Sequence, residues 1–198
     1  DQMAKFFDSL QNTVLAGFGL LIVYVLITRG ISLDHNWFAF LFRWLHVLSG
    51  IMWIGLLYYF NFVQIPSMPK IPDDQKPAVS KVIAPEALFW FRWAALSTVV
   101  TGLILAAMNG YIVGALTLGI TTGVLKHLAI GIGMWLGLIM AYNVWMIIWP
   151  NQQKALGLVE ASADDKKAAA GTAKLFSRIN TMLSVPMLFA MVAAQNIF

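Results

Sequence analysis

Five long apolar stretches constrain the fold of this chain more than any other feature. They cover about residues 12–28, 38–62, 87–109, 121–149 and 179–196. Each approaches or exceeds the roughly 20 apolar residues that a helix needs to cross the hydrocarbon core of a bilayer. Backbone polar groups at that depth must be satisfied within the protein, which favours helices as the spanning form. The sequence therefore predicts an all-α integral membrane protein, a five-helix transmembrane bundle that forms one membrane domain over residues 1–198.

The composition supports this fold class and limits the chemistry. Hydrophobic residues make up 60% of the chain and charged residues 11%, whereas soluble domains carry about 25% charged residues. Cysteine is absent, which excludes disulfides, thiolate metal sites, iron–sulfur clusters and covalent attachment of a c-type haem. A cofactor would therefore have to be held by histidine, methionine, carboxylates or packing.

The basic residues predict an orientation. With five spans, the N-terminus and the loops 63–86 and 150–178 lie on one side, and these segments hold most of the lysines. By the positive-inside rule this side is cytoplasmic. We therefore expect a multi-pass protein of the bacterial inner membrane with a periplasmic C-terminus. The net charge of +4 then reflects topology, and no nucleic-acid partner is expected.

One motif occurs twice. The run HVLSGIMWIGL at residues 46–56 returns as HLAIGIGMWLGL at residues 127–138, with Gly133 as an extra residue in the second copy. Each copy then runs into a proline, Pro66 or Pro150. The chain is therefore predicted to contain an internal parallel repeat, with copies at 38–109 and 121–196.

The two histidines that begin these motifs are predicted to lie at one level. His46 and His127 are each several residues inside a span of the same direction, so both are expected roughly 9–12 Å below the outer boundary. Gly50 and Gly131 follow at i+4, on the same helical face as the histidines. Glycines there would leave a slot beside each imidazole that accepts a flat macrocycle.

A six-coordinate haem b is the cofactor that this pattern favours, with the two histidines as axial ligands of the iron. Arg43 and Lys126 are candidates to pair with the haem propionates. Trp53 and Trp135 lie too deep for an interfacial aromatic belt, so they are expected in the core packing or in the wall of a cofactor site.

Other interpretations stay open. A single histidine in a membrane helix is often an interhelical hydrogen-bonding residue, and glycines in such helices often serve close packing. The chain is then a cofactor-free accessory subunit of a larger membrane complex, or a protein in which the histidine pair handles copper. Sequence patterns of hydrolases, zinc proteases and phosphate-binding loops are absent, so any catalysis would depend on a cofactor.

Several segments resemble the membrane portion of the cytochrome c-linked urate oxidase (urate hydroxylase) family. They are the runs at residues 43–55, 88–93, 127–152 and 178–189, and the resemblance extends over most of residues 38–195. The strings WPNQ at 149–152 and NTMLSVPM at 180–187 are the most specific parts. The resemblance implies a membrane oxidoreductase that passes electrons from urate toward cytochrome c. Since the chain has no cysteine, the partner would be a separate periplasmic cytochrome c or a larger membrane complex, beside the lipid bilayer itself.

Overall fold

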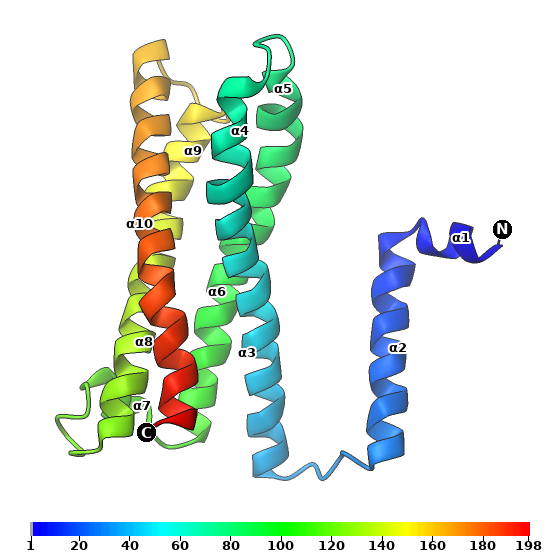
Figure 1. The fold of residues 1–198 in the computed structure, drawn as a ribbon, viewed down its shortest axis with the longest axis vertical. Helices are drawn as coiled ribbons and strands as arrows, with labels where there is room; N and C mark the ends of the chain where they lie inside the picture. The colour runs from blue at the N-terminus through cyan, green and yellow to red at the C-terminus, as the bar shows by residue number, and fades with distance from the viewer. Residues whose placement is uncertain (1) are drawn as a thin grey trace. The chain divides into compact units, whose positions relative to one another are not determined.

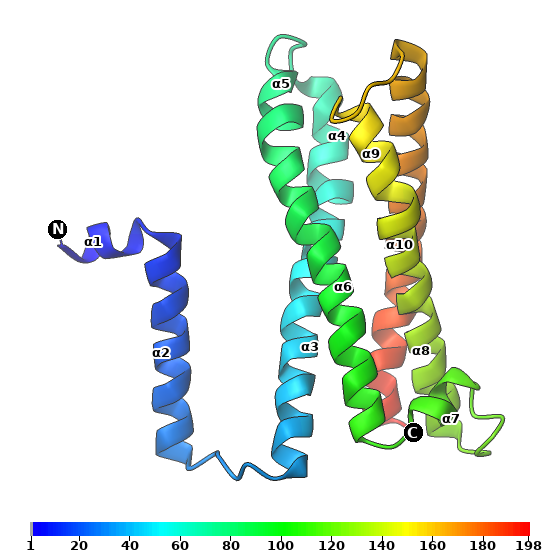
Figure 2. The same cartoon turned by 180° about the vertical axis from the view of Figure 1, so that it is seen from behind.

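The computed structural model describes residues 2–198, and over that range it consists of helices and connecting turns with no strand (Figures 1 and 2). The chain divides into two compact units, residues 1–40 and residues 41–198. Helices therefore form, as the sequence predicts.

The first unit holds α1 (Gln2–Phe7) and α2 (Leu10–Thr28). Ser9 begins α2, since its side-chain oxygen accepts a hydrogen bond from the backbone N–H of Asn12 at 3.3 Å, the usual role of an N-cap serine. Arg29 ends the helix in a left-handed conformation with a φ of 53°. No residue of α2 is buried within the protein, and a helix that is apolar on every side suits a lipid environment.

The long helices of the second unit are built from consecutive segments. Their bounds are α3 His35–Tyr58, which begins in the first unit, η1 Tyr59–Gln64, α4 Ile65–Ser67, η2 Met68–Lys70, α5 Lys76–Ala78, η3 Val79–Ile83, α6 Ala84–Met108, α7 Ile112–Leu116, α8 Leu125–Tyr142, η4 Asn143–Ile148, α9 Trp149–Ala155 and α10 Ala163–Asn196. Together with α2, the continuous helices 35–70, 76–108, 125–155 and 163–196 are long and apolar enough to cross a membrane.

These helices extend well beyond the predicted spans. The segments 63–86 and 150–178, predicted as loops, are largely helical, and α10 begins at Ala163. Ser162 caps α10 by accepting the backbone N–H of Asp165 at 3.1 Å. The apolar runs marked where a helix can lie in lipid, whereas caps and turns decide where it ends. The segment 111–119 contains the short helix α7, Ile112–Leu116.

The four long helices of the second unit run alternately up and down (Figure 1). The two repeat helices α3 and α8 therefore run in the same direction, as predicted. Helix α10 packs along α8 and α9, and Figure 2 shows the same neighbours from behind. A Cβ on Gly133 would lie 3.2 Å from the Cβ of Ala190. The extra glycine of the second motif therefore lets α8 approach α10 closely.

Short π-helical segments interrupt three of the long helices, and a proline follows two residues after each. They are η1, η3 and η4, followed by Pro66, Pro85 and Pro150. The residue before the proline donates its backbone N–H to the carbonyl five residues earlier, as Trp149 does to Val144. Proline has no N–H and its ring crowds the carbonyl four residues earlier, which a wider turn relieves. Pro186 lies in α10 without such a segment, so a proline alone is not sufficient.

The two helices that carry the repeated motif each bind α10 through an asparagine in their π-helical segment. Asn61 donates from Nδ2 to Ser177 Oγ at 2.7 Å. Asn143 donates from Nδ2 to Asn180 Oδ1 at 2.8 Å, and Asn180 donates to the carbonyl of Met140 at 3.0 Å. All these side chains are buried in the protein, so they replace hydrogen bonds to water.

Candidate functional site

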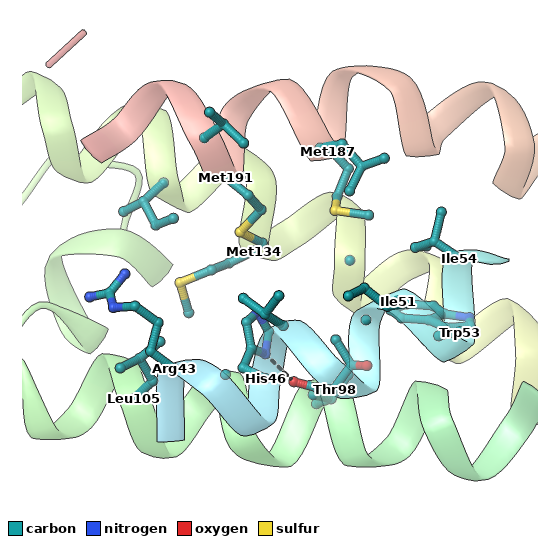
Figure 3. Close-up of a pocket in the computed structure, with 18 of the residues that line it drawn as sticks. Arg43, His46, Ile51, Trp53, Ile54, Thr98, Leu105, Met134, Met187 and Met191 are labelled. Carbon is teal, nitrogen blue, oxygen red and sulfur yellow. Dashed lines mark hydrogen bonds between the residues drawn. The ribbon is translucent and has the colours of Figure 1, made fainter. Parts of the chain in front are cut away.

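An apolar cavity of about 680 Å³ lies among the long helices of the second unit. Its wall includes residues of α3, α6, α8 and α10. Figure 3 shows His46 and Arg43 on one side of it and methionines on the other. Its volume falls in the range of about 300–1,000 Å³ that is usual for small-molecule and cofactor sites.

His46 is the principal polar side chain of this wall. Its Nδ1 lies 2.8 Å from the carbonyl oxygen of Thr98 on α6 (Figure 3). Since a carbonyl can only accept, Nδ1 carries the hydrogen and donates it. In the neutral imidazole the lone pair is then on Nε2, the atom that binds metals when Nδ1 is fixed by a backbone carbonyl. The sequence predicted His46 as a ligand but did not identify this acceptor.

A glycine of α6 accommodates the imidazole. A Cβ built on Gly102 would lie 2.7 Å from Cε1 and 3.0 Å from Nδ1 of His46. These distances are shorter than real contacts, so the ring occupies the space that a side chain at Gly102 would need. Gly102 could not be recognised from the sequence. Its role depends on a contact with His46 of α3, and residue spacing along α6 does not show that contact.

Arg43 and Tyr111 line the end of the cavity next to the turn between α6 and α7, which is termed its mouth. Both line it, and Tyr111 follows α6 in the turn before α7. Burial raises the pKa of the Tyr111 phenol above its ordinary value, although the positive charge of Arg43 acts in the opposite direction. The hydroxyl is therefore a neutral donor at physiological pH, beside a guanidinium that is always charged.

Three methionines face His46 across the cavity. Met134 comes from α8, and Met187 and Met191 come from α10 (Figure 3). Met187 is 5% exposed and packs in the same buried cluster as Trp53, whereas Met134 and Met191 are only partly buried. Their positions along the chain do not distinguish them from core residues, because thioethers are common in apolar cores.

His127 lies in a different environment. Its Nδ1 is 2.8 Å from Thr122 Oγ1 in the preceding turn, and its ring fills the space beside Gly114 of α7, where no Cβ would fit. It is not among the residues that line the cavity. Each repeat histidine therefore packs on a glycine of another helix, Gly102 of α6 or Gly114 of α7, but the two imidazoles do not line one cavity.

The other predicted site residues also differ by repeat: those of the first repeat line the cavity and those of the second do not. Gly50 and Trp53 line the cavity with His46 and Arg43. The other three, all in the second repeat, do not: they are Lys126, Gly131 and Trp135. A Cβ on Gly131 would collide with the backbone of Ala115, so this glycine serves close packing of α8 on α7.

The indole N–H groups of the two predicted tryptophans differ in their hydrogen bonding. Trp135 donates its indole N–H to the carbonyl of Leu116 at 3.0 Å. Trp53 is 1% exposed, and its indole N–H has no hydrogen-bond partner among the described residues. The sharing of one iron by His46 and His127 thus stays a prediction from the sequence alone.

The cavity fits a haem on the side of His46. Among residues 2–198 no three His, Asp or Glu side chains gather into a metal site, but a porphyrin supplies four ligands and leaves the protein one or two axial positions. The oriented imidazole, the glycine beneath it and the arginine at the mouth match an axial ligand, its support and a propionate partner. His46 and Arg43, both predicted from the sequence, line this cavity.

One comparison with known proteins gives a match. A family described as urate oxidase N-terminal matches residues 124–196, which is the second repeat from the start of α8 to the end of α10. No curated protein and no solved structure matches the chain. The second repeat is therefore similar to the N-terminal region of urate oxidase, and the resemblance predicted from the sequence is confirmed to that extent.

Proposed function

We propose that this protein is a membrane-embedded haem b protein that transfers electrons in an oxidoreductase related to urate oxidase. The observation that carries the proposal is the state of His46, whose Nδ1 is held by the Thr98 carbonyl while Nε2 is left with a lone pair at a cavity of cofactor size. The match of the second repeat to urate oxidase supports the oxidoreductase class.

The residues of the cavity have separate roles in this proposal. His46 holds the iron from α3, Thr98 fixes the imidazole orientation through its carbonyl, and Gly102 gives the ring its space. Arg43 neutralises a propionate at the mouth, where Tyr111 offers a neutral hydroxyl donor. When bound, haem b supplies reversible one-electron transfer. The apolar wall keeps water from the iron and thereby influences its potential.

Urate is the substrate that the family match suggests. Residues 1–198 contain no cysteine for covalent attachment of a haem, and a periplasmic cytochrome c as the electron acceptor remains our proposal. We place the protein in the bacterial inner membrane with its lysine-rich end in the cytoplasm, by the positive-inside rule.

Copper handling is the second candidate, and one observation favours it. His46 and the sulfur atoms of three methionines surround one cavity, and imidazole with thioethers is a ligand set that suits Cu(I). A single ion would fill little of a cavity of about 680 Å³, which is why we rank a porphyrin first.

The visible spectrum of the purified protein tests the proposal. A dithionite-reduced sample is expected to show the sharp α-band of haem b, and metal analysis to give iron without copper. His46→Ala should abolish the band, while Asn151→Ala, a substitution away from the cavity, should keep it. Copper without a haem spectrum would select the second candidate. Neither metal nor haem, in protein purified from haem-supplemented cells, would support a cofactor-free accessory subunit instead.

A further inference from the structure

We propose that the axial ligand opposite His46 is the thioether sulfur of Met191, and not His127. The inference rests on the proposed haem and assigns its second protein ligand. It is carried by the placement of side chains around the cavity, where a histidine from α3 faces methionines from α8 and α10 (Figure 3).

The side chain of His127 makes its contacts outside the cavity. Thr122 Oγ1 lies 2.8 Å from its Nδ1, Gly114 lies against its ring, and the Tyr111 ring centroid is 6.4 Å from its own. To reach the cavity, the imidazole would have to leave all three. The side chain of Met191 packs against Gly133 of α8 but already lines the cavity, so it need not leave its contacts to reach the cavity.

Burial separates the three methionines. Met187 is packed into the large buried cluster with Trp53 and Met140, so moving its sulfur would disturb the tightest part of the core. Met134 and Met191 are partly exposed and border a smaller cluster around Ala115, and Met191 also packs against the large cluster. Thioethers at such positions can change rotamer at little cost.

Helix direction separates the remaining two. Long side chains lean toward the N-terminus of their own helix. Met191 on α10 therefore leans deeper into the bundle, whereas Met134 on the antiparallel α8 leans toward the mouth. Figure 3 shows the Met134 side chain extending toward Arg43 and the Met191 side chain entering the cavity from α10.

The backbone around Met191 is also fixed. A Cβ on Gly133 would lie 3.4 Å from Cε and 3.5 Å from the backbone nitrogen of Met191, so α8 supports this residue at close range. The extra glycine of the second motif thus makes room for a methionine of α10. A histidine and methionine pair raises the potential of a haem relative to two histidines, which suits delivery of electrons to a high-potential acceptor.

The experiment compares three variants of the haem-loaded full chain in detergent. Met191→Leu is expected to keep haem through His46, to lose the near-infrared charge-transfer band of a thioether-ligated ferric haem, and to bind carbon monoxide on reduction. Met134→Leu is the matched control and is expected to keep the band. His127→Ala is expected to stay six-coordinate with the same spectrum.

A variant that exchanges the ligand distinguishes loss of the thioether from misfolding of the protein. Met191→His is expected to keep a six-coordinate low-spin haem without the thioether band and with a lower midpoint potential. An unchanged spectrum in Met191→Leu, or loss of six-coordination in Met134→Leu or His127→Ala instead, would overturn the assignment and leave the proposed function intact. Absence of haem from the unaltered protein would overturn the proposed function, and this inference with it.

Discussion

At the scale of single residues, the site depends on what lies behind His46. The Thr98 carbonyl orients the imidazole at 2.8 Å, and Gly102 leaves the space in which it lies. Neither residue contributes a side-chain ligand. Groups in this supporting position typically change metal affinity by about 10- to 100-fold when altered, so the supporting glycine is as testable as the ligand.

Gly102→Ala is predicted to weaken haem binding by at least about tenfold, because its new Cβ would lie 2.7 Å from Cε1 of His46 and displace the ring. Haem content after purification and titration of the apoprotein with haemin measure the effect. Gly171→Ala is the control: Gly171 lies in α10 outside the cavity wall, and its Cβ would meet nothing within 4 Å. Equal haem retention by the two variants would contradict the role assigned to Gly102.

At the scale of helices, α10 forms hydrogen bonds with both helices that carry the repeated motif. It receives Asn61 through Ser177 and Asn143 through Asn180. The two asparagines lie in the π-helical segments η1 and η4, so the repeat appears in the structure as the same irregular turn used twice against one helix. Local widening of a helix often accompanies such functional contacts.

Asn180→Ala is predicted to lower the free energy of unfolding by about 1–3 kcal/mol, because it leaves the buried Nδ2 of Asn143 without its acceptor and removes the bond to the Met140 carbonyl. Denaturant titration in detergent, followed by circular dichroism, measures this change. Asn151→Ala should have an effect within about 0.5 kcal/mol, since Asn151 bonds to Ile147 of its own helical turn. A loss in Asn151→Ala as large as in Asn180→Ala would show that the interhelical bond is not the cause.

At the scale of the whole molecule, helix length exceeds bilayer thickness. Helix α10 has 34 residues and is therefore about 51 Å long, against about 30 Å for the hydrocarbon core. Its apolar part is the stretch 179–196, while 163–178 contains lysines, aspartates and Arg178. About 24 Å of this helix is thus expected beyond the membrane at the lysine-rich end.

The absence of cysteine allows this depth to be measured with single cysteines. Lys167→Cys is predicted to react with a membrane-impermeant maleimide in inverted vesicles and not in right-side-out ones. Phe189→Cys is predicted to resist in both, although Phe189 is 67% exposed on the protein surface, because lipid covers it. Comparable labelling of both positions in detergent-free vesicles would contradict the membrane placement of α10.

The sequence by itself determined the helical fold class, the repeated motif and four of the residues that line the cavity. Apolar runs of spanning length are a local property, so five such helices were predictable. His46, Gly50 and Trp53 were found because a repeated motif marks them, and Arg43 because it lies one helical turn before His46; all four line the cavity. The similarity of the second repeat to urate oxidase could also be predicted from short strings of residues.

Only the tertiary structure decided which repeat copy faces the cavity. The two motifs are nearly the same along the chain, yet His46 packs on Gly102 at the cavity and His127 packs on Gly114 beside a turn. The Thr98 carbonyl and Met191 likewise depend on contacts between helices distant in sequence. Residue spacing fixes which side chains share a helix face, but the neighbours that each face meets are set by how the helices pack.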